Sequence, residues 1–252
     1  MDEVYGTRTA SSYDAWFGAF LDSARTVEAL AALAASAGGP ERGPVLELGI
    51  GTGRVALPLV AKGFRVEGID ASAEMIGQLR AKPGGDAVDI TLGDFSDFVR
   101  DDEYCLIYVA AGTFFELPSQ DAQLRCFESV ARCLRPGGLF AFDGLLPDAA
   151  SSAGQADVRM IPNPDNRLVL RFRDVQRLDQ RYTSHYLIVE NGNLHSVTVR
   201  FRYAWPSELD LMAKLAGLRL RERWGGWGGE AFTSTSASHV SIYERPPASE
   251  SA

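Results

Sequence analysis

Three glycines are the residues of this chain that most clearly indicate a ligand. Gly49, Gly51 and Gly53 directly follow an apolar run that ends at Leu48. Glycine has no Cβ, so such a turn lets the backbone come close to a bound molecule. The spacing G-x-G-x-G differs from the dinucleotide fingerprint G-x-G-x-x-G, and no Gly-Lys-Ser or Gly-Lys-Thr follows as in a Walker loop. The pattern therefore favours a nucleoside-like ligand without a pyrophosphate.

Acidic residues near these glycines refine the prediction. Glu47 stands just before them, where a carboxylate can accept hydrogen bonds from a ligand ammonium group. Asp70 ends a second apolar run, at the position where an acid can bind both ribose hydroxyls. Asp94 and Phe95 follow a third run and can meet the exocyclic amine and the ring of an adenine. The set predicts a nucleoside site with a cationic group beside it.

The order E-x-G-x-G-x-G, strand-end Asp, then Gly-Asp-Phe resembles class I S-adenosylmethionine (SAM) dependent methyltransferases over residues 5–245. The resemblance implies an α/β fold with a seven-stranded Rossmann-like sheet whose last strand is antiparallel. It also implies SAM as cofactor and S-adenosylhomocysteine (SAH) as its product. The cofactor contacts expected from it are Tyr5, Tyr13, Glu47, Gly49, Gly51, Gly53, Asp70, Ala71, Met75, Gly93, Asp94, Phe95 and Ala110.

The chain is more closely similar to small bacterial N-methyltransferases of natural-product pathways. These are the enzymes that dimethylate amino sugars and those that dimethylate the N-terminal amine of linaridin-type peptides. The matching residues include Tyr5, Tyr13, the Thr113-Phe114-Phe115 segment and residues 229–233. In that family N-terminal tyrosines reach the cofactor and help to close the site. The resemblance therefore makes Tyr13 the expected catalytic residue near the acceptor atom.

The resemblance implies methyl transfer to an amine of a small molecule or peptide in secondary metabolism. After the predicted strand at 104–110 the chain lacks the Asn/Asp-Pro-Pro-Tyr segment of base and glutamine-amide methyltransferases and offers no histidine, which favours an aliphatic amine. Aromatic rings and carboxylates together suit a cation. The candidate acceptor contacts are Thr113, Phe114, Phe115, Glu116, Trp227 and Glu230. The glycine loop that carries Trp227 is either a substrate lid or a turn that packs on an inserted sheet.

Two other functions stay open at this point. An O-methyltransferase would need a definite base, which His185, His195 or Tyr182 could supply from the inserted sheet. A SAM-binding scaffold without turnover would keep the cofactor residues alone. Glu47, Asp70 and Asp94 are all present, which argues against loss of cofactor binding.

The elements that position these residues alternate between strand and helix from residue 45 to 143, which predicts a parallel sheet with helices on both faces. We expect one domain over 1–252: an N-terminal helical cap (1–40), a SAM-binding core (45–143), an inserted antiparallel sheet on the substrate side (150–205), and a helix with the last two strands (206–246). Asn191-Gly192 predicts a type I′ hairpin turn within the inserted sheet. The arginines that alternate with apolar residues there, such as Arg171 and Arg173, are predicted to lie on its solvated face.

Composition excludes several classes of partner. The formal charge of −8 over 252 residues disfavours nucleic acid, whose binding draws on Lys and Arg contacts to phosphate. No signal peptide or apolar span is recognisable, so we expect a cytoplasmic protein that does not enter a membrane. Neither the cysteines, which read as free thiols, nor the histidines show metal-binding spacing, so no metal is expected. The chain is expected to be a monomer or a homodimer.

Overall fold

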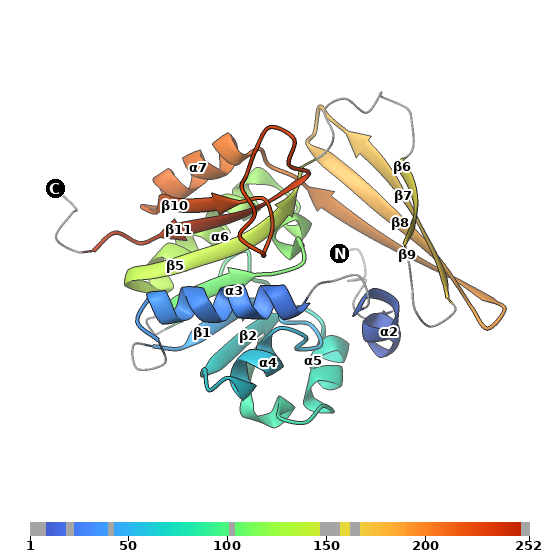
Figure 1. The fold of residues 1–252 in the computed structure, drawn as a ribbon, viewed down its shortest axis with the longest axis horizontal. Helices are drawn as coiled ribbons and strands as arrows, with labels where there is room; N and C mark the ends of the chain where they lie inside the picture. The colour runs from blue at the N-terminus through green and yellow to red at the C-terminus, as the bar shows by residue number, and fades with distance from the viewer. Residues whose placement is uncertain are drawn as a thin grey trace.

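The structure is a computed structural model that describes residues 9–18, 23–39, 43–100, 104–146, 157–161 and 167–247. Its main layer is a seven-stranded sheet in the order β10-β11-β5-β4-β1-β2-β3 (Figure 1). The strands are β1 (Val45–Leu48), β2 (Val66–Asp70), β3 (Asp89–Leu92), β4 (Tyr104–Val109), β5 (Leu134–Leu145), β10 (Arg219–Trp224) and β11 (Ser238–Glu244). β11 runs antiparallel to both β5 and β10, while the pairs from β5 to β3 are parallel. The predicted seven-stranded sheet with an antiparallel last strand is confirmed.

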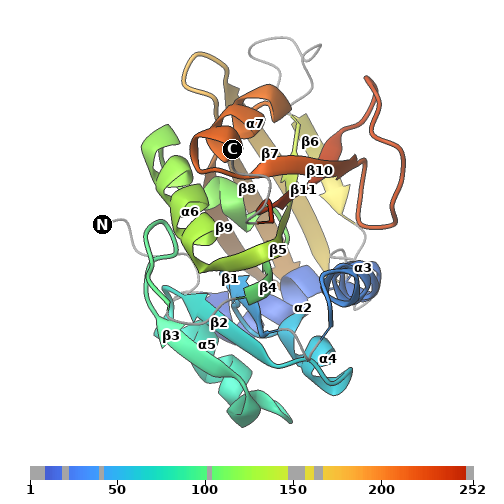
Figure 2. The ribbon, with the colours of Figure 1, turned by 90° about the vertical axis from the view of Figure 1, so that its left-hand side faces the viewer.

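Helices pack on both faces of this sheet, as the strand–helix alternation predicted (Figure 2). The α-helices are α2 (Tyr13–Phe17), α3 (Ser23–Ser36), α4 (Ala56–Ala61), α5 (Ala73–Arg80), α6 (Gln120–Cys133) and α7 (Pro206–Leu215). Within the described residues the 3₁₀ helices are η1 (Ala10–Ser12), η4 (Gly85–Ala87) and η5 (Thr113–Glu116). The apolar stripe of α3 is buried against one face of β1 and β4, and α6 and α7 cover the other face. Each face therefore has its own apolar core.

The strand order places β1 between β2 and β4, so successive connections leave β1 in opposite directions. A crevice opens at the carboxyl ends of the strands at such a switch point, and ligands of open α/β sheets bind there. The predicted glycine turn begins at Gly49, directly after β1. The strand order thus puts this turn, the end of β2 and the start of η5 at one edge of the sheet.

A second sheet, β6-β7-β8-β9, stands beside that edge (Figure 1). Its strands are β6 (Asp157–Ile161), β7 (Leu168–Gln176), β8 (Arg181–Glu190) and β9 (Asn193–Arg202), all paired antiparallel. The inserted antiparallel sheet was predicted, but β6 was not, because a run of five residues is too short for its alternation to stand out. The turn between β8 and β9 has Asn191 at φ 50° and Gly192 at φ 78°, which agrees with the predicted type I′ hairpin.

The prediction that the arginines of β7 face solvent is wrong. Arg171 and Arg173 share their side of the strand with Val169, because side chains two positions apart point the same way. Val169 is fully buried, whereas Leu168 on the opposite side is 40% exposed. The structure therefore turns both arginines toward the rest of the molecule and leaves several apolar residues of the opposite side partly in water.

Candidate active site

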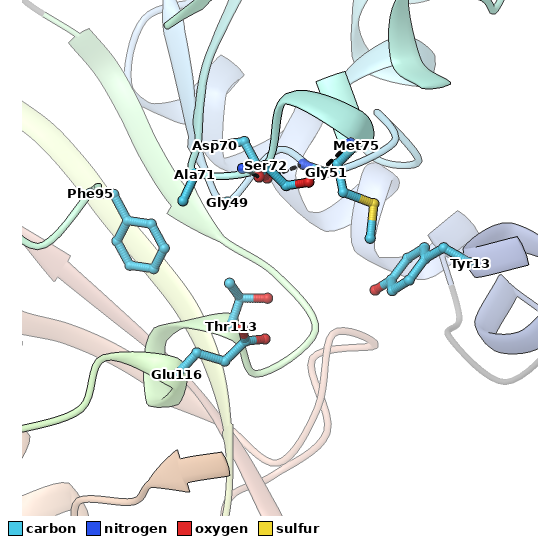
Figure 3. Close-up of a pocket in the computed structure, with 10 residues that line it drawn as sticks. All are labelled: Tyr13, Gly49, Gly51, Asp70, Ala71, Ser72, Met75, Phe95, Thr113 and Glu116. Carbon is cyan, nitrogen blue, oxygen red and sulfur yellow. Dashed lines mark hydrogen bonds between the residues drawn. The ribbon is translucent and has the colours of Figure 1, made fainter. Parts of the chain in front are cut away.

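A cavity lies at the carboxyl edge of β1 and β2, where the strand order predicts a ligand (Figure 3). Its volume is about 520 Å³ including the opening to solvent, which suits a cofactor-sized molecule. The residues that line it are Tyr13, Gly49, Gly51, Asp70, Ala71, Ser72, Met75, Phe95, Thr113 and Glu116. They come from α2, the glycine turn, the β2–α5 junction, the loop after β3 and η5.

The glycine turn needs glycine for two different reasons. Gly49, Gly51 and Gly53 all have positive φ, at 73°, 56° and 75°. A Cβ on Gly49 would lie 2.7 Å from Cγ2 of Thr113, so glycine lets η5 close on the turn at the cavity. A Cβ on Gly53 would lie 2.7 Å from Cγ of Leu79, so this glycine serves the packing of α5 and does not line the cavity.

The carboxylate of Asp70 ties the turn to the end of β2. Its Oδ2 accepts a hydrogen bond from the Gly51 amide at 2.7 Å, and its Oδ1 accepts one from the Ser72 amide at 2.8 Å. Burial raises the pKa of Asp70, and hydrogen bonds from backbone amides oppose that rise. Each carboxylate oxygen can accept more than one hydrogen bond, so Asp70 keeps acceptor capacity for ligand hydroxyls in the cavity.

Met75 and Phe95 give the cavity its apolar walls, on either side of Asp70 and Ala71 (Figure 3). Ser72 was not predicted. Its hydroxyl accepts the Met75 amide at 3.2 Å and caps α5, so the helix signal at Ser72 could have indicated it. The cap fixes the start of α5 and with it the Met75 side chain that lines the cavity.

Several expected cofactor contacts do not line this cavity. Glu47 is buried beneath the sheet edge and accepts a hydrogen bond from the Tyr108 hydroxyl at 2.8 Å, and burial raises its pKa to about 8. Asp94 is exposed and accepts hydrogen bonds from the amide and hydroxyl of Ser96. Gly93 donates its amide to the carbonyl of Asp70, and Ala110 is buried. A contact of these residues with SAM stays a prediction, and Tyr5 lies outside the described residues.

The helical turn η5 separates its residues into a cavity side and a core side. A 3₁₀ helix has three residues per turn, so Thr113 and Glu116 share a side, and both line the cavity. Phe114 and Phe115 are fully buried, and the Phe114 ring stacks on Phe142 with 4.4 Å between centroids. The expected acceptor contacts Phe114 and Phe115 therefore belong to the apolar core and do not line the cavity.

Glu116 is the most unusual group of the cavity. Burial raises the pKa of its carboxyl to about 8, and the negative charge of Asp70 adds to the rise. No described residue donates a hydrogen bond to it within the cavity. The cavity thus contains a carboxyl group that can hold or release a proton near neutral pH.

Tyr13 enters the cavity from α2, with its hydroxyl toward Thr113 and Glu116 (Figure 3). The next residue, Asp14, joins α2 to the glycine turn: its carboxylate accepts the Thr52 hydroxyl at 2.6 Å and pairs with the Lys82 ammonium at 2.5 Å. Lys82 also donates to the carbonyl of Thr52 at 2.7 Å. No sequence spacing indicated these contacts, because three separate segments meet only in the folded chain.

The inserted sheet holds the other side of α2. The Trp16 indole donates to Glu190 at 3.3 Å, and Arg167 binds the same carboxylate at 2.5 Å and the carbonyl of Ala15 at 3.0 Å. Trp16 and Phe17 are buried against the sheet. Tyr13 is therefore positioned by contacts to both the glycine turn at the cavity and the inserted sheet.

The remaining predicted acceptor contacts lie away from this cavity. Trp227 packs on the core beside α3 and β4. Burial raises the pKa of the Asp143 carboxyl to about 6, and a hydrogen bond donated by Trp227 opposes that rise. Glu230 is half exposed and pairs with Arg25 of α3 at 3.4 Å. The loop after β10 therefore docks on α3 in this structure. A role of Trp227 or Glu230 in acceptor binding stays a prediction.

The bases considered for O-methylation are also placed elsewhere. His185 is exposed and bonded to Thr198 at 3.0 Å, and His195 contacts Trp16 with 5.0 Å between ring centroids. Tyr182 is buried, which raises the pKa of its hydroxyl. None of the three is among the residues that line the cavity.

Fold and site together define a class of protein. The fold is a parallel sheet with an antiparallel last strand and a glycine turn at the switch point. The residues of the cavity fit the parts of SAM: Asp70 would meet the ribose hydroxyls, and Phe95 and Met75 would enclose the adenine. The open backbone at Gly51 would leave room for the methionine moiety. No group of three or more His, Cys, Asp or Glu that could hold a metal occurs in the described ranges. No helix of the described chain is long and apolar enough to cross a membrane.

Comparisons with known proteins agree with this class. A family model described as a methyltransferase domain matches residues 45–138. Cypemycin N-terminal methyltransferase from a Streptomyces species is 30% identical over 203 residues, which are 80% of this chain and 82% of that protein. The CcbJ methyltransferase from Streptomyces caelestis superposes with a TM-score of 0.85 at 35% identity, covering 96% of this chain and 98% of its own. The chain belongs to the family of SAM-dependent methyltransferases.

A further solved structure shows the fold alone. SAM-bound CalS10 is an amino pentose methyltransferase from Micromonospora echinaspora. It has a TM-score of 0.72 at 18% identity and covers 97% of this chain and 99% of its own. The similarity spans the inserted sheet as well as the main one, so the two sheets together form the shared architecture.

Proposed function

We propose that this methyltransferase moves the methyl group of SAM to an amine of a small molecule or peptide in a natural-product pathway. The observation that carries the proposal is Glu116, a carboxyl that lines the same cavity as Asp70 and has a pKa raised to about 8. The name of a relative supports the same chemistry, since it describes an N-terminal methyltransferase.

An amine must lose a proton before it can act as a nucleophile. The N-terminal amine of a peptide has a pKa of about 7.7–8.0, close to the raised pKa of Glu116. Proton transfer from the acceptor ammonium to the Glu116 carboxylate is then nearly balanced in free energy, which is the condition for efficient base catalysis. Glu116 takes one N–H proton, and the nitrogen lone pair that remains forms the new N–C bond.

When bound, SAM supplies an electrophilic methyl group on a sulfonium sulfur, and the electrons of the broken C–S bond stay on that sulfur. The residues of the chain supply position and a dry environment, which account for much of the rate of an in-line displacement. Tyr13 stands opposite Glu116, where its hydroxyl can orient the amine. Tyr13 touching the acceptor is part of this proposal, as are a cytoplasmic location and a monomeric or homodimeric state.

The test compares Glu116→Gln with Glu128→Gln, a change at an exposed position of α6. Labelled SAM is offered with a panel of primary amines, peptides with free N-termini and phenols. We expect amines to be methylated, and Glu116→Gln to lower kcat about 10²- to 10⁴-fold at neutral pH. Raising the pH above the pKa of the acceptor should restore much of the loss, because the amine then arrives deprotonated. Methylation confined to phenols, or a Glu116→Gln variant with the wild-type rate at neutral pH, would contradict the proposal.

A further inference from the structure

The side of the inserted sheet that faces the rest of the molecule, here called the inner face, is apolar at both ends. One end is marked by Val169 and Ile188, which are buried together with Val197 and Val199 of β9 against Trp16 and Phe17 of α2. At the other end Tyr182 and Tyr203 join the core cluster that includes the buried residues of η5. The inner face therefore spans the distance from α2 to η5, the two elements that bring Tyr13 and Glu116 to the cavity.

On β7 and β8 the middle of the inner face is polar, whereas β9 continues the same rows with Val197 and Val199. Arg171 pairs in register with Tyr186, and Arg173 with Ser184, so these four side chains are neighbours on one side of the sheet. The guanidinium of Arg173 lies over the Tyr182 ring, 5.0 Å from its centroid. Both arginines are half-buried. Turning two cations inward costs desolvation free energy that anionic partners must offset.

Two tyrosines connect this polar strip to Glu116 electrostatically. Burial raises the pKa of the hydroxyls of both Tyr182 and Tyr186; the Arg173 guanidinium opposes that rise, and the Glu116 carboxylate adds to it. β9 also contacts η5 directly. The polar strip therefore adjoins η5, the element that brings Glu116 to the cavity, because Arg173 lies over Tyr182 and Tyr182 packs in one cluster with the buried residues of η5.

We infer that Arg171 and Arg173 bind a carboxylate carried by the acceptor, so that the acceptor is an amine and an acid in one molecule, such as an amino acid or a short peptide. The inference rests on the proposed amine methylation, since it places the amine at Glu116. Guanidinium groups match a carboxylate in geometry and can bind it through two hydrogen bonds. A chain of net charge −8 repels anions at long range, so an anionic substrate needs local cations of this kind.

The experiment uses amines in matched pairs that differ only in one carboxylate: amino acids and dipeptides with a free C-terminus, and the same molecules as C-terminal amides. We expect the carboxylate member of the preferred pair to have a kcat/KM at least about 10-fold higher, mainly through KM. Arg173→Gln and Arg171→Gln should each reduce that preference about 10- to 100-fold. Arg200→Gln, on the exposed outer side of β9, should keep it. SAH affinity and Tm of each variant check that the fold is intact.

The outcomes separate the two proposals. If both members of every pair are methylated equally, or the amides are preferred, the carboxylate site is refuted while amine methylation stands. If no amine is methylated in either form, the proposed function fails, and the carboxylate site is then tested by binding of hippurate to the SAH-loaded protein. Hippurate binding that weakens at least about 10-fold in Arg173→Gln supports the site, and absent or unchanged binding refutes it.

Discussion

Replacing Gly49 by alanine tests how closely η5 packs on the glycine turn. Two costs add at this position. The backbone has φ of 73°, and an L side chain in that region costs about 1–2 kcal/mol. The new Cβ would also lie 2.7 Å from Cγ2 of Thr113, and overpacking of this kind costs about 1–3 kcal/mol. We expect Gly49→Ala to lower the free energy of unfolding by about 2–5 kcal/mol.

Gly63 provides a matched control for the backbone cost. It has φ of 91°, and a Cβ built there meets nothing within 4 Å. Gly63→Ala should therefore cost only about 1–2 kcal/mol. In a chain of this size 1 kcal/mol changes Tm by about 2–4 °C, so Gly49→Ala should melt about 2–12 °C below Gly63→Ala.

Thr113→Ser removes the atom that the new methyl group would strike. The Thr113 Cβ would then be the nearest atom of that side chain, at 3.7 Å, an ordinary contact distance. Thermal or urea unfolding of the two single variants and of Gly49→Ala/Thr113→Ser gives a double-mutant cycle. We expect the double variant to recover the overpacking cost and to approach Gly63→Ala. If Gly49→Ala and Gly63→Ala are equally stable, or Thr113→Ser restores nothing, the close packing of η5 on the turn is refuted.

Three shorter predictions concern the carboxylates around the cavity. Asp70→Asn keeps the shape of the side chain but loses the charge that strengthens hydrogen bonds to ligand hydroxyls. Calorimetry should therefore show SAH binding weakened about 10- to 100-fold. Unchanged SAH affinity would contradict the assignment of Asp70 to the site. The pKa of Glu47 is raised from 4.5 to about 8 in the folded state, so its contribution to stability is complete below pH 4.5 and is lost as pH rises through about 8. Urea unfolding across this range should show a smaller loss of stability with pH in Glu47→Gln than in the native chain. Equal slopes of stability against pH would contradict the assignment. Asp14→Ala removes a partly exposed ion pair with Lys82, so Tm should change by only about 1–4 °C. The value of kcat/KM should fall about 10-fold, because Tyr13 loses its position. A loss of stability without a loss of activity would show that the contact between Asp14 and Lys82 is structural only.

The sequence by itself determined the class of the protein and the methyl donor. Local patterns carried this information: the glycine spacing after an apolar strand, the acid at the end of the next strand, and the alternation of strands and helices. These patterns can be recognised in the sequence alone, because the positive φ angles at Gly49 and Gly51 exclude almost every residue type other than glycine. The seven-stranded sheet, its antiparallel last strand and the Asn191-Gly192 hairpin follow from the same kind of local rule.

Only the tertiary structure decided which polar groups share a cavity. Phe114 and Glu116 are two positions apart in the sequence, yet a single 3₁₀ turn places the first in the core and the second beside Asp70. The sequence predicted that Arg171 and Arg173 lie on a solvated face. The alternation of polar and apolar residues shows that a strand has two different sides, but it does not show which side other elements cover. The covering elements, α2 and η5, come from distant parts of the chain. Burial and the pKa shift of Glu116 arise from those contacts, so no sequence pattern could express them.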